Sequence, residues 1–209
     1  LKNVLMQLST SELKDLIFNA GLGANFTAGT CEDISLSVAN LESLNINGGR
    51  EFLYAISCKR HSIKNFEIKD KEAKVEFGRA LFEGIYAVDL LISEKVNTIV
   101  FKKFDCPMLL VGLGHNYYNS SFIIYYCSKI IGGIKAGTIF WDKDFKLRNC
   151  SIKIIKSNEI LGQYSELKDR IDLTQSTFKK LNKLAAKMLV PESDHSRATG
   201  AGAGIIDND

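Results

Sequence analysis

Apolar residues in the first third of the chain recur with the period of an α-helix. Ser9 and Glu12 form a capping-box pattern that predicts a helix start, and a helical stripe follows it: Leu13, Leu16, Ile17 and Ala20. Gly21 is a typical stop for this helix. A second helix is predicted to begin near Thr27, and a third, shorter helix follows the Asn- and Gly-rich break at residues 45–49. We therefore expect a helical N-terminal third.

Beyond residue 65 the pattern changes from helical to alternating. Residues 66–69 and 74–77 alternate between apolar and polar, and apolar runs bounded by Gly or Asn-Ser predict further strands: residues 98–101, 108–111, 122–127, 137–141 and 151–155. Residues 80–93 are long enough for a helix, although Gly84 lowers its helix propensity. The pattern predicts an α+β fold with a mixed or antiparallel sheet in the middle of the chain.

The C-terminal amphipathic helix is the clearest element of the pattern. Thr174 is a suitable N-cap, and the predicted buried stripe consists of Phe178, Leu181, Leu184, Ala185 and Met188. Four lysines occupy the opposite, solvated face: Lys179, Lys180, Lys183 and Lys187. Pro191 prevents the helix from continuing, so a Gly-rich tail follows it.

Composition and charge narrow the class of protein. A chain of 209 residues with 45% hydrophobic residues is expected to form a single domain over residues 1–209, with a possible helical subregion at 1–60. The net charge of +3 comes from basic residues scattered among acidic ones, so we expect no nucleic-acid partner. No apolar run is long enough to cross a membrane, and the first residues lack a signal-peptide pattern. Five cysteines without a CxxC pair indicate reduced thiols, and we expect a cytoplasmic protein.

The tail gathers several functional groups in a short segment. Three glycines, Gly200, Gly202 and Gly204, allow the backbone to approach an anion closely, and Ser196 and Arg197 precede them as further ligands. His195 and Asp207 are candidates for proton transfer. The alternative is that the segment is a mobile or surface-packed terminus, because polar Gly-rich segments bury little apolar surface.

A second candidate follows the predicted strand at 108–111. Gly112, Gly114 and His115 form a GxGH sequence, which indicates either a loop that holds a ligand, with His115 as an acid or base, or an ordinary strand-end loop. The three histidines have no metal-ligand spacing, so no metal is predicted. No nucleotide or flavin motif is present, and no cofactor is predicted.

The two ends of the chain resemble a bacterial family designated domain of unknown function 3726. Members of that family finish with a helix, a Val-Pro-x-(Ser/Thr)-x-x-Ser-Arg-like segment and a Gly-Ala-Gly-Ala-Gly stretch before Asp-Asn-Asp. Residues 190–197, 200–204 and 207–209 match this pattern, and residues 8–13 are similar to the family's N-terminal helix. Phe18 and Asn19 stand where the family shows a basic residue with small neighbours. The resemblance implies that the tail is part of the protein's design and folds back on the domain.

Two hypotheses about function follow from these features. The first is a bacterial hydrolase or lyase, or a subunit of one, acting on a small anionic metabolite that Arg197 and the tail glycines would hold. The second is a noncatalytic accessory or assembly protein whose tail docks on a neighbouring subunit, for example in a homo-oligomer. The sequence alone does not specify a reaction.

Overall fold

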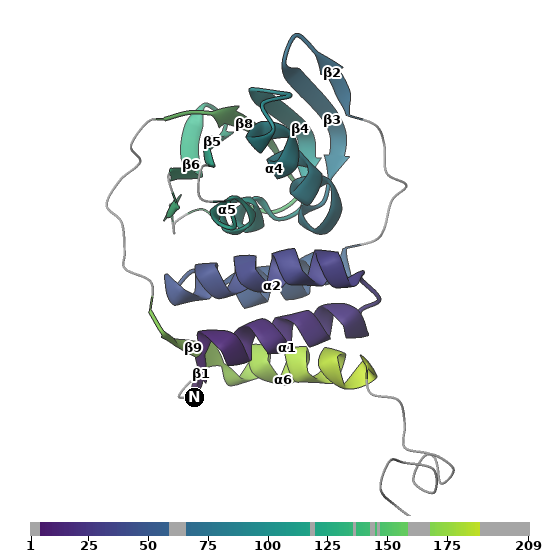
Figure 1. Ribbon diagram of the computed structural model, residues 1–209, viewed down its shortest axis with the longest axis vertical. Coiled ribbons are helices and arrows are strands. Elements are labelled where there is room, and N and C mark those ends of the chain that lie inside the picture. The colour runs from purple at the N-terminus through teal and green to yellow at the C-terminus, as the bar shows by residue number, and fades with distance from the viewer. Residues whose placement is uncertain are drawn as a thin grey trace, which may run out of the picture.

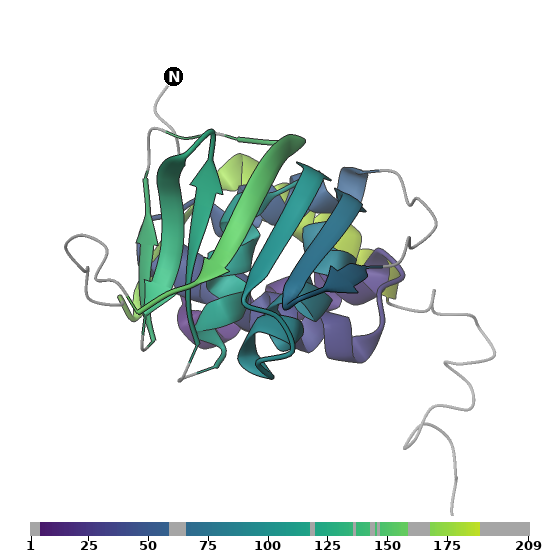
Figure 2. The ribbon, with the colours of Figure 1, turned by 90° about the horizontal axis from the view of Figure 1, so that it is seen from above.

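The structure is a computed structural model. It describes residues 5–58, 66–117, 120–135, 137–142, 145, 147–158 and 168–188. Figure 1 shows successive layers: a sheet at the top, α4 and α5 beneath it, then α2, and finally α1 beside α6. Seen from above in Figure 2, the sheet lies in front of all the helices, so the helices cover only one of its faces. The described chain therefore combines helices with a mixed sheet, which is the α+β class expected.

The N-terminal segment consists of one short strand and three helices: β1 (Leu5–Ser9), α1 (Thr10–Gly23), α2 (Ala28–Ser43) and α3 (Gly48–Ser57). The capping box is confirmed, because the Glu12 amide donates to Ser9 Oγ at 3.2 Å and the Ser9 amide donates to the Glu12 carboxylate at 2.7 Å. Thr27 caps α2 as expected. Gly21 does not end α1, which continues for two more residues and packs along α6.

Seven strands form the mixed sheet: β2 (Glu67–Lys69), β3 (Glu72–Gly78), β4 (Thr98–Phe104), β5 (Ser121–Tyr126), β6 (Lys129–Lys135), β7 (Thr138–Trp141) and β8 (Cys150–Lys156). Their order is β2-β3-β4-β8-β5-β6-β7. Among these described strands, β3 and β4 are the one pair that runs parallel. A π-helical turn, η1 (Ala80–Gly84), and α4 (Ile85–Ile92) make the crossover that a parallel pair requires.

The apolar run at 108–111 is helical, and the strand predicted there is wrong. It belongs to α5 (Pro107–His115), which starts with proline at its first turn and is buried along most of its length. A helix enclosed on all sides is apolar all round, so its sequence cannot be distinguished from a buried strand by periodicity. Gly112 and Gly114 are consequently helical residues and do not form a strand-end loop.

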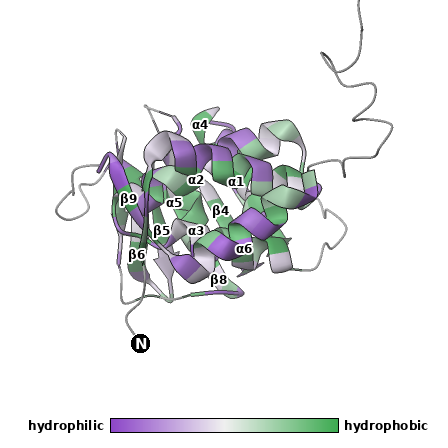
Figure 3. Cartoon of the chain, turned by 90° about the horizontal axis from the view of Figure 1, so that it is seen from below, coloured by the Kyte–Doolittle hydropathy of each residue, from purple (hydrophilic) through white to green (hydrophobic). Residues whose placement is uncertain are grey.

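The C-terminal part begins with β9 (Arg170–Thr174), which pairs antiparallel with β1 to form a second, two-stranded sheet that the pattern did not predict. Thr174 caps α6 (Gln175–Ala185), and a 3₁₀ turn, η2 (Ala186–Met188), follows. Figure 3 shows hydrophilic and hydrophobic residues alternating around α6, on the side of the molecule opposite the sheet. Met188, predicted to be buried, is 42% exposed.

A single apolar core connects the helices and the sheet. Its members include residues of α1, α2, α5 and the inner sheet face, for example Ile17, Val38, Leu109, Phe101 and Ile124. Among the residues that the structure describes, no helix has the length and apolar character needed to cross a bilayer.

Candidate functional site

Most of the site predicted from the sequence lies outside the described residues, whose last segment ends at Met188. This applies to His195, Ser196, Arg197, Gly200, Gly202, Gly204 and Asp207. Their roles stay predictions. His115 is the one predicted site residue that the structure places.

His115 is located in the last turn of α5, where it connects elements of the fold. Its Nδ1 lies 2.8 Å from Nδ2 of Asn40 on α2. Burial lowers the pKa of its imidazole, and a hydrogen bond to the Gly137 backbone acts in the opposite direction. The preceding glycines permit close packing, because a Cβ at Gly112 would lie 2.2 Å from Ser37 Oγ. His115 lines neither of the two cavities described below, so the structure does not place it in a ligand site.

A groove of about 780 Å³ lies between α3 and α6, and we call it the basic groove. Its charged lining consists of Glu42, Arg50, Arg148, Asp172, Lys180, Lys183 and Lys187. Apolar side chains complete the wall: Leu53, Ile56, Leu173 and Leu184. The volume lies within the range of small-molecule sites in proteins, which is about 300–1,000 Å³.

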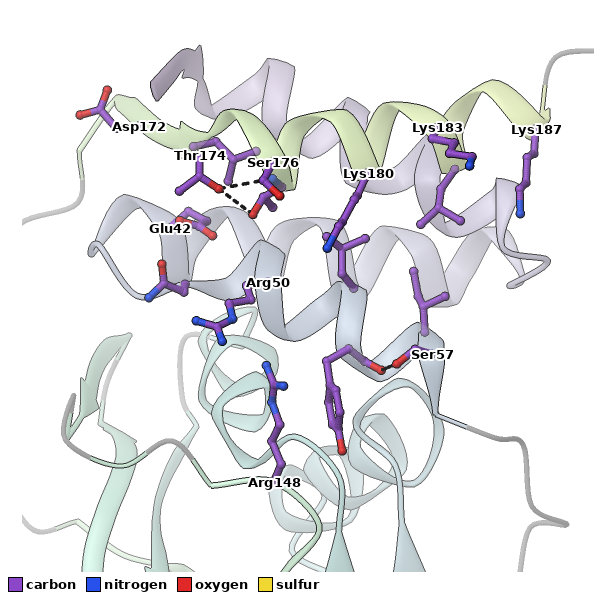
Figure 4. A pocket seen from close by; sticks show the side chains of 17 residues that line it. Glu42, Arg50, Ser57, Arg148, Asp172, Thr174, Ser176, Lys180, Lys183 and Lys187 are labelled. Carbon is purple, nitrogen blue, oxygen red and sulfur yellow. Dashed lines mark hydrogen bonds between the residues drawn. The ribbon is translucent and has the colours of Figure 1, made fainter. Parts of the chain in front are cut away.

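Two lysines of α6 and one of η2 line one side of the basic groove. Lys180, Lys183 and Lys187 recur every three or four residues, so they share a helical face. Figure 4 shows Lys180 extending from α6 toward α3, and Arg148 pointing up toward Arg50. Arg50 comes from the first turn of α3, whereas Arg148 precedes β8. Three separate segments of the chain therefore direct cations into one volume.

Arg148 is held in a fixed orientation. Its Nε and Nη2 donate to the two carboxylate oxygens of Glu51 at 3.0 and 2.6 Å. The guanidinium also lies over the ring of Tyr54, 3.9 Å from the centroid. Asn149 in turn donates to the Tyr54 hydroxyl. A bidentate carboxylate leaves further guanidinium N–H groups free to donate, and it pre-orients them for a second anion.

Arg50 has no such restraint. Its side chain is exposed at the edge of the groove, and within the described part of the chain it forms no hydrogen bond or ion pair. The same holds for Lys180, Lys183 and Lys187. These four cations have no carboxylate partner among the described residues, so they favour a negatively charged ligand.

Glu42 is the titratable group of the groove whose pKa departs most from its ordinary value. It belongs to α2 and is only 8% exposed. Its Oε1 accepts a hydrogen bond of 2.8 Å from the Gly49 amide at the start of α3. Burial raises the pKa of the Glu42 carboxyl to about 7, although the Gly49 amide acts to lower it. A carboxyl with a pKa near neutrality is suited to accept and release protons at physiological pH.

A smaller cavity of about 300 Å³ adjoins the basic groove, and we call it the aromatic compartment. Its apolar lining comes from several elements: Ile46, Met108, Trp141, Phe145 and Leu147. It shares Asn47, Arg50 and Arg148 with the basic groove. The remaining lining of the compartment includes Asn45 and Glu51, so the two arginines stand at the junction of the basic groove and a cavity with both apolar and polar walls.

The chemistry available in this region is anion binding with proton transfer. In the segments that the structure describes, no group of three His, Cys, Asp or Glu side chains is placed to hold a metal ion. Cysteine is not an activated nucleophile here, because burial raises the pKa of the Cys58 thiol next to Tyr54. Arginine and lysine donors together with the Glu42 carboxyl, whose pKa is about 7, are the groups of the groove best suited to this chemistry.

Comparison with protein-family models, with curated proteins and with solved structures finds no match for this chain. The interpretation of the site consequently depends on its own geometry.

Sequence reasoning missed most of this region. The predicted solvated lysine face is confirmed, because Lys179, Lys180, Lys183 and Lys187 are all exposed, but the pattern does not predict that a groove lies beside it. Arg50, Arg148 and Glu42 carry no local motif, because they are distant in the sequence and meet only through packing of α2, α3 and the segment before β8. The one local signal was the Gly48-Gly49-Arg50 sequence at the start of α3, where the Gly49 amide is free to meet a buried carboxylate.

Proposed function

We propose that this protein binds a small anionic metabolite in the basic groove. The observation that carries the proposal is the convergence of Arg50, Arg148 and Lys180 from three segments on one cavity, with Lys183 and Lys187 further along it. Arg50 and the lysines have no carboxylate partner among the described residues, so a bound anion would reduce the repulsion between them. A plain solvated helix face would not need two arginines from other elements opposite its lysines.

We further propose that the metabolite is transformed by hydrolase or lyase chemistry, with Glu42 as the group that moves a proton. The raised pKa of Glu42, about 7, supports this role, because both protonation states are populated at neutral pH. Perturbed carboxyls inside cavities are typical of functional sites. The arginines and lysines would hold the substrate anion and offset negative charge that develops during the reaction.

The binding proposal is tested by titrating the protein with sulfate and with pyrophosphate in an isothermal calorimeter. Arg50→Gln and Lys180→Gln should each weaken pyrophosphate binding about tenfold, the effect of losing one charge-assisted hydrogen bond. Lys179→Gln is the matched control, since Lys179 lies on the same helix but does not line the groove. Equal weakening in the control variant, or none in any variant, would place anion binding elsewhere.

Proton transfer by Glu42 has its own test, which requires no known substrate. An anion that binds beside a carboxylate raises the pKa of that carboxyl, so wild-type protein should take up part of a proton near pH 7 when sulfate binds. Calorimetry in buffers of different ionisation enthalpy measures this uptake. Glu42→Gln should bind sulfate without it. Identical proton uptake in the variant would exclude Glu42 from the site.

A further inference from the structure

Resting on the anion-binding function above, we propose that the natural ligand is a phosphate ester that carries a flat ring. The phosphate would bind between Arg50 and Arg148, and the ring would occupy the aromatic compartment. Both arginines line both cavities, so one molecule placed at the junction reaches the two spaces at once.

The hydrogen-bond donors at the junction fit a phosphate better than a single carboxylate. Arg148 is already bound to Glu51, which also lines the compartment, and Arg50 has no partner in the described part of the chain. The remaining N–H donors of the two guanidinium groups match the several oxygens of a phosphate monoester. Lys180 lines the adjoining basic groove.

Trp141 is one of the two aromatic residues that line the aromatic compartment. It is 6% exposed and packs on β6 at Gly132, where a Cβ would lie 2.4 Å from the indole ring. The sheet therefore fixes the indole position. Phe145 and Met108 line the same cavity, and aromatic rings and thioether sulfur both make favourable contacts with flat π systems.

The indole N–H of Trp141 is buried and has no acceptor within the described part of the chain. Because the buried Nε1 presents almost no surface to the compartment, it does not contribute to the choice of ring. The compartment therefore selects for a flat ring rather than for a particular heteroatom in that ring.

Trp141 is the only tryptophan in the chain, so intrinsic fluorescence reports selectively on this compartment. The test compares AMP with ribose 5-phosphate, which share the phosphate and differ by the heterocyclic ring. Phenyl phosphate and inorganic phosphate form a second pair with a simpler ring. Affinities come from calorimetry, and the emission of Trp141 is followed in parallel.

At least one ring-bearing probe should bind about tenfold more tightly than its ring-free counterpart, because its ring would contact the aromatic side chains of the compartment. The same probe should change the emission of Trp141 saturably. Trp141→Leu should remove the preference for the ring while it leaves ribose 5-phosphate binding unchanged. Arg50→Gln should weaken all four probes, and Lys179→Gln should affect none.

Two results would overturn the inference. The first contradicts only the ring-binding inference, and the second also contradicts anion binding in the basic groove. If ring-bearing and ring-free phosphates bind equally and Trp141 emission does not change, the aromatic compartment is not part of the site, while anion binding in the basic groove remains. If no phosphate binds, or if Arg50→Gln behaves like Lys179→Gln, the proposed function fails as well.

Discussion

Replacing Glu42 by glutamine should show how much the buried carboxyl lowers the free energy of unfolding near neutral pH. The carboxyl is 8% exposed and accepts one hydrogen bond, from the Gly49 amide at 2.8 Å. Glutamine keeps an oxygen acceptor of nearly the same shape, so the bond to the start of α3 is preserved. The substitution therefore removes only the titration.

The magnitude follows from the pKa of the group. Burial raises the pKa of Glu42 from 4.5 to about 7, so the folded protein binds this proton more tightly than the unfolded chain. Stability linked to Glu42 is then greatest below pH 4.5 and declines as the pH rises toward 7. At about 1.4 kcal/mol per pKa unit the total loss is about 3 kcal/mol, and about 2 kcal/mol of it falls between pH 5 and pH 7.

Urea unfolding of wild type and Glu42→Gln at a series of pH values measures this directly. The unfolding free energy of the variant, relative to wild type, should rise by about 2 kcal/mol from pH 5 to pH 7, because only wild type has to ionise a buried carboxyl. Glu32→Gln, an exposed site on the same helix, controls for the loss of one acidic side chain. Parallel pH curves for wild type and Glu42→Gln would refute the assigned pKa.

Four further variants test the packing and the local signals. Gly112→Ala should destabilise the fold by about 1–3 kcal/mol in urea unfolding, because the added Cβ would lie 2.2 Å from Ser37 Oγ. Gly29→Ala is the control: Gly29 has open space around it, so this variant should be neutral or slightly stabilising in the same assay. Ser9→Ala should reduce the unfolding free energy by about 1 kcal/mol through loss of the α1 cap. Burial lowers the pKa of His115, so stability should fall as the pH drops below its ordinary value of 6.5, and His115→Gln should flatten that acid-side decline in thermal melts.

The N-terminal helices were predictable because their signals are local. The Ser9 and Glu12 side chains satisfy amides within the same turn, and Thr27 and Thr174 do the same for their helices. Each of these interactions spans only three residues, so it depends little on the rest of the fold. The lysine face of α6 was predictable for the same reason, as a helical repeat.

The run at 108–111 shows where such reasoning fails. Its residues are apolar in succession, which fits a buried strand and a buried helix equally well. Packing decided in favour of the helix: α5 lies between α2 and the sheet, and Gly112 and Gly114 allow the close approach to Ser37 and Phe122. The β1–β9 pair was missed because its two strands come from opposite ends of the chain.

The sequence by itself determined the helix caps, the helical faces and the presence of a sheet, since these depend on neighbours within a few residues. Only the tertiary structure decided the candidate site. Arg50, Arg148 and Lys180 are ordinary surface cations in the sequence, and their shared groove exists because α3, α6 and the segment before β8 pack on one core. Likewise, the pKa of Glu42 on α2 is raised because its carboxyl is buried against the start of α3. No local pattern of residues encodes this burial.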